Sequence, residues 1–368
     1  HILEHLLFKD SKKFNRKNGK PMMEYLELLG AAINASTWLD RTNYYEMLPS
    51  EHLEKALAIE ADRIRGSLFS NEDLASEMTV VRNEFERSRN NPYEILDEAV
   101  LATAFQVHPY RIPTIGIKED IEGATAETLR AFYDQYYWPN NATLAIFGDA
   151  TRKDVEALVL KHFGNIPRSK HDIPVMETVE PRQTKSRRVA VEKPVGVSIL
   201  SLSYKIPRGT DKDFSAVYML AMILAGGLSS RLQKELVDTG VVAELSVFVF
   251  PLFDEGIMTF TATLNKNTAV KTVEKRMREV IHSAKMNTVT AAEVARARER
   301  ILSQIAEEHD GVFSEIRAVS ESIAAGDWTL GYRFENEIKK LTKTDITRVA
   351  KKYLVVEGET VGNLIDTL

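Results

Sequence analysis

Apolar residues in the first half of the chain follow the spacings of helices and strands. The segments "LAIEADRIRGSL" (57–68) and "EMTVVRNEFERSRN" (77–90) place apolar residues three to four positions apart, which predicts amphipathic helices. The segment "INASTWLDRTNYYEML" (33–48) is rich in Thr and Tyr, and we interpret "NAST" as an exposed strand end before a polar turn. A helix over 126–137 and a strand, "ATLAIFGD" (142–149), are expected next.

The second half restarts with the strand-like "VGVSILSLSYKI" (195–206), and helix, strand and helix patterns follow. Between the halves, residues 166–188 hold three prolines and many charges, which is typical of a linker. We therefore predict a first domain over 1–165, a linker over 166–188 and a second domain over 189–368.

The two predicted domains resemble each other. At a constant offset of 217 residues, Leu129, Tyr136 and Thr143 correspond to Ile346, Tyr353 and Thr360. The alternative is that any two αβ units look alike. Extending the match backwards sets Glu84 opposite Arg300, and the second half has no histidine motif like the one at the chain start. A duplicated chain would thus carry its chemistry in one copy only.

Composition narrows the function classes. The chain has 368 residues, of which 44% are hydrophobic and 27% charged, values that are ordinary for a globular protein with a packed core. The formal net charge of −5 gives no basic field for nucleic acid. No apolar run is long enough to span a membrane. Cysteine is absent, so any metal must be held by His, Asp or Glu.

The first five residues, "HILEH", carry the candidate chemistry. Residues four apart lie on one face of a helix, so His1 and His5 can direct both imidazoles at one ion. Glu4 lies beside them, where it can act on a metal-bound water as a general base. Zinc suits this arrangement, because three protein ligands leave a fourth position for that water.

Two histidines leave a zinc site one ligand short, and the helix over 77–90 offers two carboxylates. Glu77 and Glu84 are seven residues apart, nearly two helical turns, and so share a face. We assign Glu84 as the third ligand and Glu77 as a catalytic support that holds the ligands. The alternatives are that the histidine pair is accidental and that both glutamates belong to a solvated face. The positions of the other histidines are more typical of helix caps, loops, solvent-exposed helix faces or the linker than of metal ligands.

These motifs together resemble the pitrilysin/insulinase family of zinc peptidases, whose HxxEH motif reverses the more common HExxH. The glutamate helix "ASEMTVVRNEFERSRNNPYE" follows His5 at the family's spacing, and Glu84 lies 79 residues after His5. Further family landmarks follow in order: "NASTWLDRTNYY", "HPYRIPTIGIKEDI", "FYDQYYWPNNATLAIFGD", "FGNIP" and "GGLSSRLQKEL". The resemblance covers nearly the whole chain and is closest to the two-domain bacterial type related to mitochondrial processing peptidase.

The resemblance implies an α+β fold of two homologous domains, each a mostly antiparallel sheet with helices packed on one face. It implies a zinc-dependent endopeptidase with one zinc per chain, in which Glu4 activates the water. Extended or unfolded peptides would pair as an added strand with the backbone of Asn34, Ala35, Ser36 and Thr37. The family's first strand should precede HxxEH, so we expect residues before His1. We also expect a soluble protein of the bacterial periplasm or cytoplasm.

One departure concerns partners. Many relatives carry an Arg and a Tyr after "GGLSSRLQKEL" that hold the substrate backbone, whereas this chain has Val237 and Ala243 near those positions. We therefore expect a dimer, and favour a heterodimer with a related non-catalytic chain over a homodimer in which Arg231 or Tyr218 substitutes.

Three other interpretations stay open in principle. A non-catalytic structural subunit of this fold, like the core proteins of a respiratory complex, should have a degenerate site, whereas this motif is intact. A lyase acting on S-ribosylhomocysteine also uses HxxEH, but it is a single short domain with a cysteine. A chance HxxEH in an unrelated αβ protein does not explain the ordered landmarks.

Overall fold

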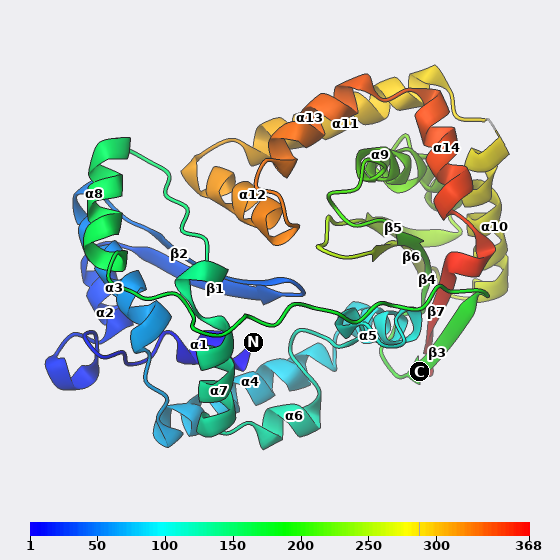
Figure 1. Ribbon diagram of the computed structural model, residues 1–368. Coiled ribbons are helices and arrows are strands. Elements are labelled where there is room, and N and C mark those ends of the chain that lie inside the picture. The colour runs from blue at the N-terminus through cyan, green and yellow to red at the C-terminus, as the bar shows by residue number, and fades with distance from the viewer. Residues whose placement is uncertain (287) are drawn as a thin grey trace. The chain divides into compact units, whose positions relative to one another are not determined.

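The computed structural model describes residues 1–286 and 288–368, and the chain divides into two compact units (Figure 1). The first unit comprises His1–Arg87 and Pro113–Glu177, and the second comprises Ser88–Ile112 and Thr178–Leu368. These units differ from the predicted domains in residues 88–112, which lie in the first half of the sequence but pack within the second unit. The predicted linker is also divided, with 166–177 in the first unit and 178–188 in the second. The helix in that segment explains the difference, as described below.

The first unit is mainly helical. Its elements are α1 (Ile2–Leu6), α2 (Met22–Leu28), β1 (Ala32–Trp38), β2 (Arg41–Met47), α3 (Leu53–Gly66), α4 (Asn71–Ser88, which reaches the unit boundary), α6 (Lys118–Gly123), α7 (Ala126–Tyr136) and α8 (Arg152–Phe163), with 3-10 turns at Arg16–Asn18, Ser50–His52 and Pro139–Asn141. Strands β1 and β2 form an antiparallel hairpin that pairs Ala32 with Met47 at one end and Trp38 with Arg41 at the other.

The hydrophobic core of the first unit fixes α1 against α4. Leu3, Leu6 and Leu7 are buried in one cluster with α4 residues that recur three to four positions apart, such as Leu74 and Val81. This apolar stripe is the helical periodicity seen in the sequence. Because the polar residues of α1 and α4 flank the same contact, packing of the leucines brings the polar side chains together.

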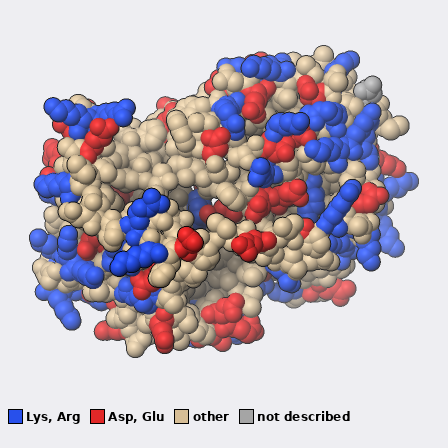
Figure 2. Space-filling view, viewed as in Figure 1, with Lys and Arg blue, Asp and Glu red and all other residues tan. Residues whose placement is uncertain are grey.

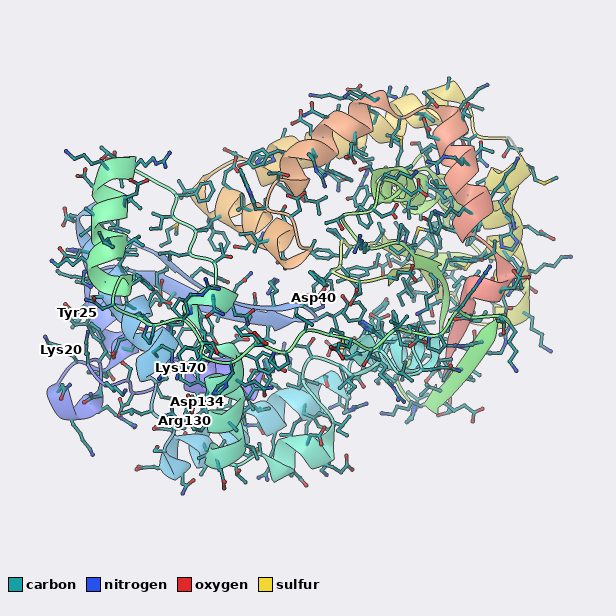
Figure 3. All side chains as sticks on the ribbon, in the orientation of Figure 1. Lys20, Tyr25, Asp40, Arg130, Asp134 and Lys170 are labelled. Atoms are coloured by element: carbon teal, nitrogen blue, oxygen red, sulfur yellow. The ribbon has the colours of Figure 1, made fainter. Side chains whose placement is uncertain are left out.

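Helix α7 is joined to the end of α3 by polar contacts. Figure 3 labels Arg130 and Asp134 on this helix. Arg130 donates to the backbone carbonyl of Ser67 at 2.7 Å, and Asp134 pairs with Arg65 at 3.0 Å. These contacts hold α7 in the cluster that contains α1 and α4.

The second unit is built around a five-stranded sheet. Its elements are α5 (Pro92–Ala104), β3 (Arg187–Lys193), β4 (Ile199–Ile206), α9 (Phe214–Ala225), a π-helical turn (Gln233–Val237), β5 (Val242–Phe248), β6 (Gly256–Leu264), α10 (Val270–Ser283), α11 (Ala291–Glu308), α12 (Val312–Ala324), α13 (Leu330–Lys340), α14 (Lys343–Tyr353) and β7 (Glu359–Asp366), with 3-10 turns at Pro109–Arg111, Ala284–Met286 and Val356–Gly358. The strand order is β3-β7-β4-β6-β5. Among the strands of the described residues, only β3 and β7 pair in parallel.

Helices cover the sheet according to the alternation of its side chains. Val361 of β7 is buried with α9, α10 and α14, whereas Leu364, three residues later, is buried with α5 on the opposite face. Gly362 allows α5 to approach closely, since a Cβ there would lie 2.4 Å from a methyl group of Val100. The contact between α5 and β7 places residues 88–112 in the second unit.

The prediction of an α+β protein of two units is confirmed, and its strand pairing is mostly antiparallel. The five-stranded sheet carries helices on both faces and not on one, because α5 packs on the face opposite α9, α10 and α14. The internal repeat is visible in α7 and α14, whose bounds differ by 217 residues at both ends. Each helix begins after a threonine, Thr125 or Thr342, that forms a capping box.

One predicted strand was wrong. Residues 142–147 lie outside any strand, and their side chains include the exposed Leu144 and Phe147. An alternating pattern gives a segment the propensity to extend, but a strand also needs a neighbour for its backbone hydrogen bonds. Within the part of the chain that the structure describes, this segment pairs with no strand.

Charged side chains of both signs are mixed on the face of the molecule shown in Figure 2. Among the described residues, no helix combines the length and apolar character needed to cross a bilayer.

Candidate metal centre

Helices α1 and α4 bring together the three predicted metal ligands. One ligand atom from each of His1, His5 and Glu84 lies within 4.8 Å of the others. The Nε2 atoms of both histidines are 3.7 Å from Oε2 of Glu84. Among the described residues, no other group of three such side chains meets the same spacing.

This spacing fits a zinc ion. Two ligand atoms that are each about 2.0–2.1 Å from a tetrahedral zinc lie about 3.3–3.4 Å apart. The two 3.7 Å separations from Glu84 exceed this value by only a few tenths of an ångström, and the ligand atoms of the two histidines lie within 4.8 Å of each other. The Glu84 side chain is 44% exposed, whereas the two imidazoles are 18–19% exposed, so one side of the cluster is open to solvent. Two imidazoles and one carboxylate form a donor set typical of catalytic zinc.

Glu77 contacts the ring nitrogen of His5 that does not face Glu84. Its Oε2 lies 3.1 Å from Nδ1 of His5, which leaves Nε2 of that ring facing Glu84. A carboxylate in this position fixes the tautomer and orientation of a ligand histidine. The same carboxylate pairs through Oε1 with the ammonium of Lys9 at 2.5 Å. Sequence reasoning missed Lys9, which lies in the bend after α1, beyond the end of the helix that carries His5.

Glu4 is buried beside this cluster and is 9% exposed. Its carboxylate accepts a hydrogen bond from the hydroxyl of Thr37 on β1. Thr37 in turn lies 3.2 Å, hydroxyl to hydroxyl, from its cross-strand partner Thr42. The hairpin therefore fixes the position of the carboxylate predicted to act as the base.

Two tyrosines extend this polar network. The hydroxyls of Tyr44 on β2 and Tyr137 after α7 lie 3.1 Å apart. Burial raises the pKa of Tyr44 well above its usual 10.0, and burial also raises the pKa of Tyr137. The negative charge of Glu4 contributes to both shifts. Both phenols stay protonated at neutral pH, and no single-residue signal in the sequence marked them.

The predicted substrate-binding residues Asn34–Thr37 lie together on β1. Within the described residues, β1 pairs with β2 along one edge and with no strand along the other. At its end, Arg41 donates to the carbonyl and hydroxyl oxygens of Ser36 at 3.0 and 2.9 Å. Asn34 accepts a hydrogen bond from the backbone N–H of Ala35. Only Thr37 reaches the candidate centre with a side-chain hydrogen bond.

The two residues considered as substitutes for the family's substrate-holding pair have other partners. The guanidinium of Arg231 donates to both carboxylate oxygens of Glu293, at 2.7 and 2.9 Å, and to the carbonyl of Thr288. Tyr218 packs edge-to-face against Phe334 at 5.2 Å between ring centroids. Both contacts stabilise the helical layer of the second unit.

Comparisons with known proteins agree with the fold and the motif. Residues 1–118 match the family model described as Insulinase (Peptidase family M16), and residues 123–301 match the model described as Peptidase M16 inactive domain. The chain is similar to a Helicobacter pylori protein named zinc protease PqqE, with 30% identity over 364 residues that cover 96% of this chain and 80% of that one. It is also similar to a Bacillus subtilis protein named uncharacterized zinc protease YmxG, with 25% identity over 82% of this chain and 72% of that one.

The structure shows the same relationship. It superimposes on the crystal structure of a protease from Helicobacter pylori with a TM-score of 0.93 and 27% identity, covering 99% of this chain and 88% of that one. A Pseudomonas fluorescens structure described as a peptidase M16 inactive domain gives a TM-score of 0.86 at 20% identity, covering 100% of this chain and 87% of that one, and so shows the fold alone.

The chain thus has the two-unit α+β fold of a protease structure, with the sequence HxxEH at its start and a glutamate-bearing helix, α4. The chain belongs to the M16 family, the pitrilysin/insulinase peptidases, as the motifs predicted.

Proposed function

We propose that this chain is a zinc-dependent endopeptidase that hydrolyses extended or unfolded peptides. The observation that carries the proposal is the position of Glu4, a buried carboxylate on the same helical turn as two imidazoles that converge with Glu84. Relatives that are named zinc proteases support the same proposal.

Each residue of the centre has a role in this proposal. A zinc ion held by His1, His5 and Glu84 would supply Lewis-acid chemistry toward a water and a peptide carbonyl. Glu4 accepts the proton of the attacking water and returns it to the leaving amine. Thr37 holds the Glu4 carboxylate in position, and Glu77 orients His5.

The open edge of β1 supplies substrate selection. An extended peptide that adds to this edge gains backbone hydrogen bonds from residues 34–37, next to the hydroxyl that contacts Glu4. A folded protein cannot present such a strand without local unfolding. The proposed substrates are therefore extended or unfolded peptides.

The decisive experiment compares Glu4→Gln with Glu84→Gln in the full chain, using a quenched fluorescent peptide and zinc analysis after dialysis. Glu4→Gln should keep its zinc and lose about 10²–10⁴-fold in turnover, because an amide cannot accept the water's proton. Glu84→Gln should lose the metal as well, since it removes a charged ligand. Retained turnover in a zinc-replete Glu4→Gln preparation would remove Glu4 from the mechanism.

The same assay tests the alternative function, a non-catalytic subunit of this fold. The model matched by residues 123–301 is described as inactive, but HxxEH and Glu84 lie outside that range. A non-catalytic subunit with a degenerate site would retain no zinc after dialysis and show no turnover with any partner chain.

We also propose that the working enzyme is a dimer, and favour a heterodimer with a related chain that lacks HxxEH. Arg231 is engaged with Glu293, and Tyr218 with Phe334, so neither side chain is free to hold a substrate backbone in this structure. A homodimer would duplicate the metal centre without adding the missing pair.

A further inference from the structure

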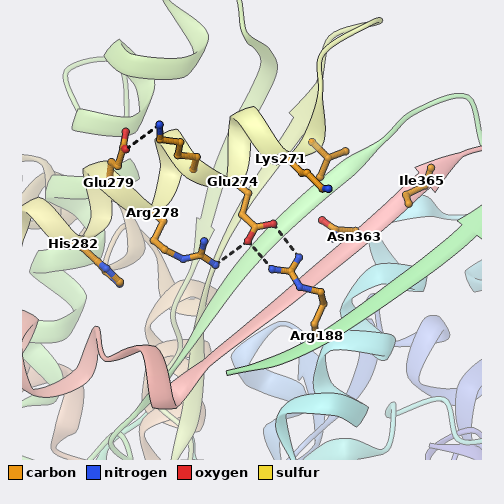
Figure 4. Close-up of a pocket in the computed structure, with 10 residues that line it drawn as sticks. Arg188, Lys271, Glu274, Arg278, Glu279, His282, Asn363 and Ile365 are labelled. Atoms are coloured by element: carbon orange, nitrogen blue, oxygen red, sulfur yellow. Dashed lines mark hydrogen bonds and ion pairs between the residues drawn. The ribbon is translucent and has the colours of Figure 1, made fainter. Parts of the chain in front are cut away.

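A cavity of about 840 Å³ lies in the second unit, beside α10 and over β3 and β7 (Figure 4). The charged face of α10 forms one wall, and Arg188, Asn363 and Ile365 contribute from the strands. This volume lies within the range of about 300–1,000 Å³ that is usual for ligand sites. The cavity is formed by residues of one unit only and contains none of the candidate metal ligands.

Most charges around the cavity are already paired. Arg188 donates to both carboxylate oxygens of Glu274, at 2.9 and 2.6 Å, and Arg278 donates to the same carboxylate at 2.8 Å. Arg278 also pairs with the buried Glu359 at 2.8 Å. The guanidinium of Arg188 lowers the pKa of Glu274, which therefore stays ionised. Because these four groups pair with one another, few of their hydrogen-bond donors and acceptors remain for a ligand.

Two polar groups of the cavity have no such partner. Asn363 is 8% exposed, and its buried Oδ1 lacks a hydrogen-bond partner in the part of the chain that the structure describes. A buried acceptor left unpaired is destabilising, so a donor is expected there. Lys271 is exposed at the start of α10 and forms no ion pair within the described ranges. Figure 4 shows Asn363 and Lys271 at the same cavity.

The chemistry of these two groups defines a ligand. Oδ1 of Asn363 needs a hydrogen-bond donor, and the ammonium of Lys271 attracts a single negative charge. Lys275, which also lines the cavity, pairs with Glu279 at 3.9 Å, so among the described lining residues Lys271 is the one lysine or arginine without an ion pair. A phosphate group usually takes several cationic donors. The last residue of a peptide supplies both the donor and the charge, because its backbone N–H and its carboxylate are attached to the same carbon. Val270 and Ile365 provide apolar surface for its side chain.

We propose that this cavity binds the carboxyl-terminal residue of a peptide, with the backbone N–H at Asn363 and the carboxylate at Lys271. The inference rests on the proposed function only for the source of the ligand, because peptide hydrolysis produces new carboxyl ends. An apolar terminal residue such as leucine matches Val270 and Ile365. The site is distinct from the metal centre in residues and in chemistry.

The test measures fluorescence anisotropy of a labelled Gly-Gly-Ala-Leu peptide with either a free carboxylate or a carboxamide at its C-terminus. The full chain carries Glu4→Gln and is kept in EDTA, so neither cleavage nor metal binding contributes. The free acid should bind at least about tenfold more tightly than the amide, as expected for loss of one charged contact. Equal affinity for the two peptides, or no binding of the acid up to millimolar concentration, would overturn the proposal.

Two variants and a control locate the site. Lys271→Glu changes an exposed residue, should leave the fold intact, and should abolish or reverse the preference for the free acid. Asn363→Leu removes the acceptor and should weaken both peptides by a similar factor. Lys351→Glu, on an exposed lysine outside the cavity, should leave both affinities unchanged. A preference that survives Lys271→Glu would overturn the assignment, whatever the outcome of the turnover assay.

Discussion

Thr37 lies on β1 with its hydroxyl against the carboxylate of Glu4. Sequence reasoning selected this residue for its backbone, as one of four that pair with a substrate strand. The structure adds a contact of its side chain. Because a hydrogen bond to a carboxylate restricts its rotation, the hydroxyl holds Glu4 in one orientation relative to the histidines of the same helix.

Thr37→Val keeps the β-branched shape of the side chain and removes the hydroxyl. We expect kcat to fall about tenfold, as for loss of one hydrogen bond to a charged group, with KM and zinc content close to wild type. Thr37→Ser restores the hydroxyl and should recover most of kcat. Steady-state kinetics with a quenched peptide give both constants. If KM rises while kcat is unchanged in Thr37→Val, the side chain acts in substrate binding instead.

The ligand set could be predicted from the sequence because it has a chemical signature. His1 and His5 are spaced by one helical turn, and Glu84 lies on a helix whose period is visible. Lys9 and the hydroxyl of Thr37 carry no such signal, since a single lysine or threonine is common on any surface. Their partners, Glu77 and Glu4, are set by the packing of α1 against α4 and β1, which the sequence does not specify locally.

At the scale of elements, helices were easier to predict than strands. The helix predicted over 126–137 is α7, and its counterpart α14 repeats its bounds and its threonine cap. A helix forms its hydrogen bonds within one segment, so its pattern and caps are local. The predicted strand over 142–149 depends on a neighbour elsewhere in the chain. Its copy in the second unit, β7, lies between β3 and β4 and is therefore a strand.

Helix α9 is joined to α14 through Asp213 at its start. This carboxylate is fully buried and accepts hydrogen bonds from Lys352, Arg348 and Tyr353 at 2.7–3.0 Å. Burial alone would raise the pKa of Asp213, but these hydrogen bonds outweigh it and lower the pKa to about 2. The ordinary value is 3.8, so the unfolded chain binds this proton more readily than the folded one.

The sign of the shift gives a pH-dependent prediction. A depressed pKa stabilises the fold above pH 3.8, and this contribution is lost as the pH falls toward 2. Asp213→Asn should therefore lower stability at pH 7, by about 1–2 kcal/mol after allowing for solvent around the exposed cations, and the difference should shrink below about pH 4.

Urea unfolding of the wild type and of Asp213→Asn between pH 7 and pH 2.5 measures this difference. The exposed Asp172→Asn is the control, and should leave the unfolding midpoint unchanged at every pH. A deficit in Asp213→Asn that is constant across the whole range would mean that the charge of Asp213 is not what stabilises this contact.

At the scale of the whole molecule, the two units are related but not equivalent. The first holds HxxEH and Glu84, whereas Arg300 occupies the position that corresponds to Glu84 in the second. In the second unit, glutamates such as Glu293 and Glu274 pair with arginines rather than meeting histidines. The duplicated unit therefore provides helices, a sheet and the α10 cavity, and leaves the proposed chemistry to the first unit.

Because only one of the two units holds HxxEH and Glu84, a partner chain could supply what the second unit lacks. Peptide hydrolysis at a metal benefits from a site that excludes water, because electrostatic interactions strengthen there. The chain has the proposed base and ligands, but it has Val237 and Ala243 near the positions where the family resemblance leads us to expect a substrate-holding Arg and Tyr. A related chain that carries this pair and lacks HxxEH would complement it.

The full-length chain should be purified alone and together with its closest co-expressed relative, and both samples assayed with the same quenched peptide. We expect turnover to appear, or to rise at least about tenfold, only on mixing, and to disappear when this chain carries Glu4→Gln. Replacing the Arg or Tyr of the partner should reduce kcat in the mixture without changing the zinc content of this chain. Full activity from the isolated chain, with no gain on mixing, would contradict the heterodimer and favour a homodimer or a monomer.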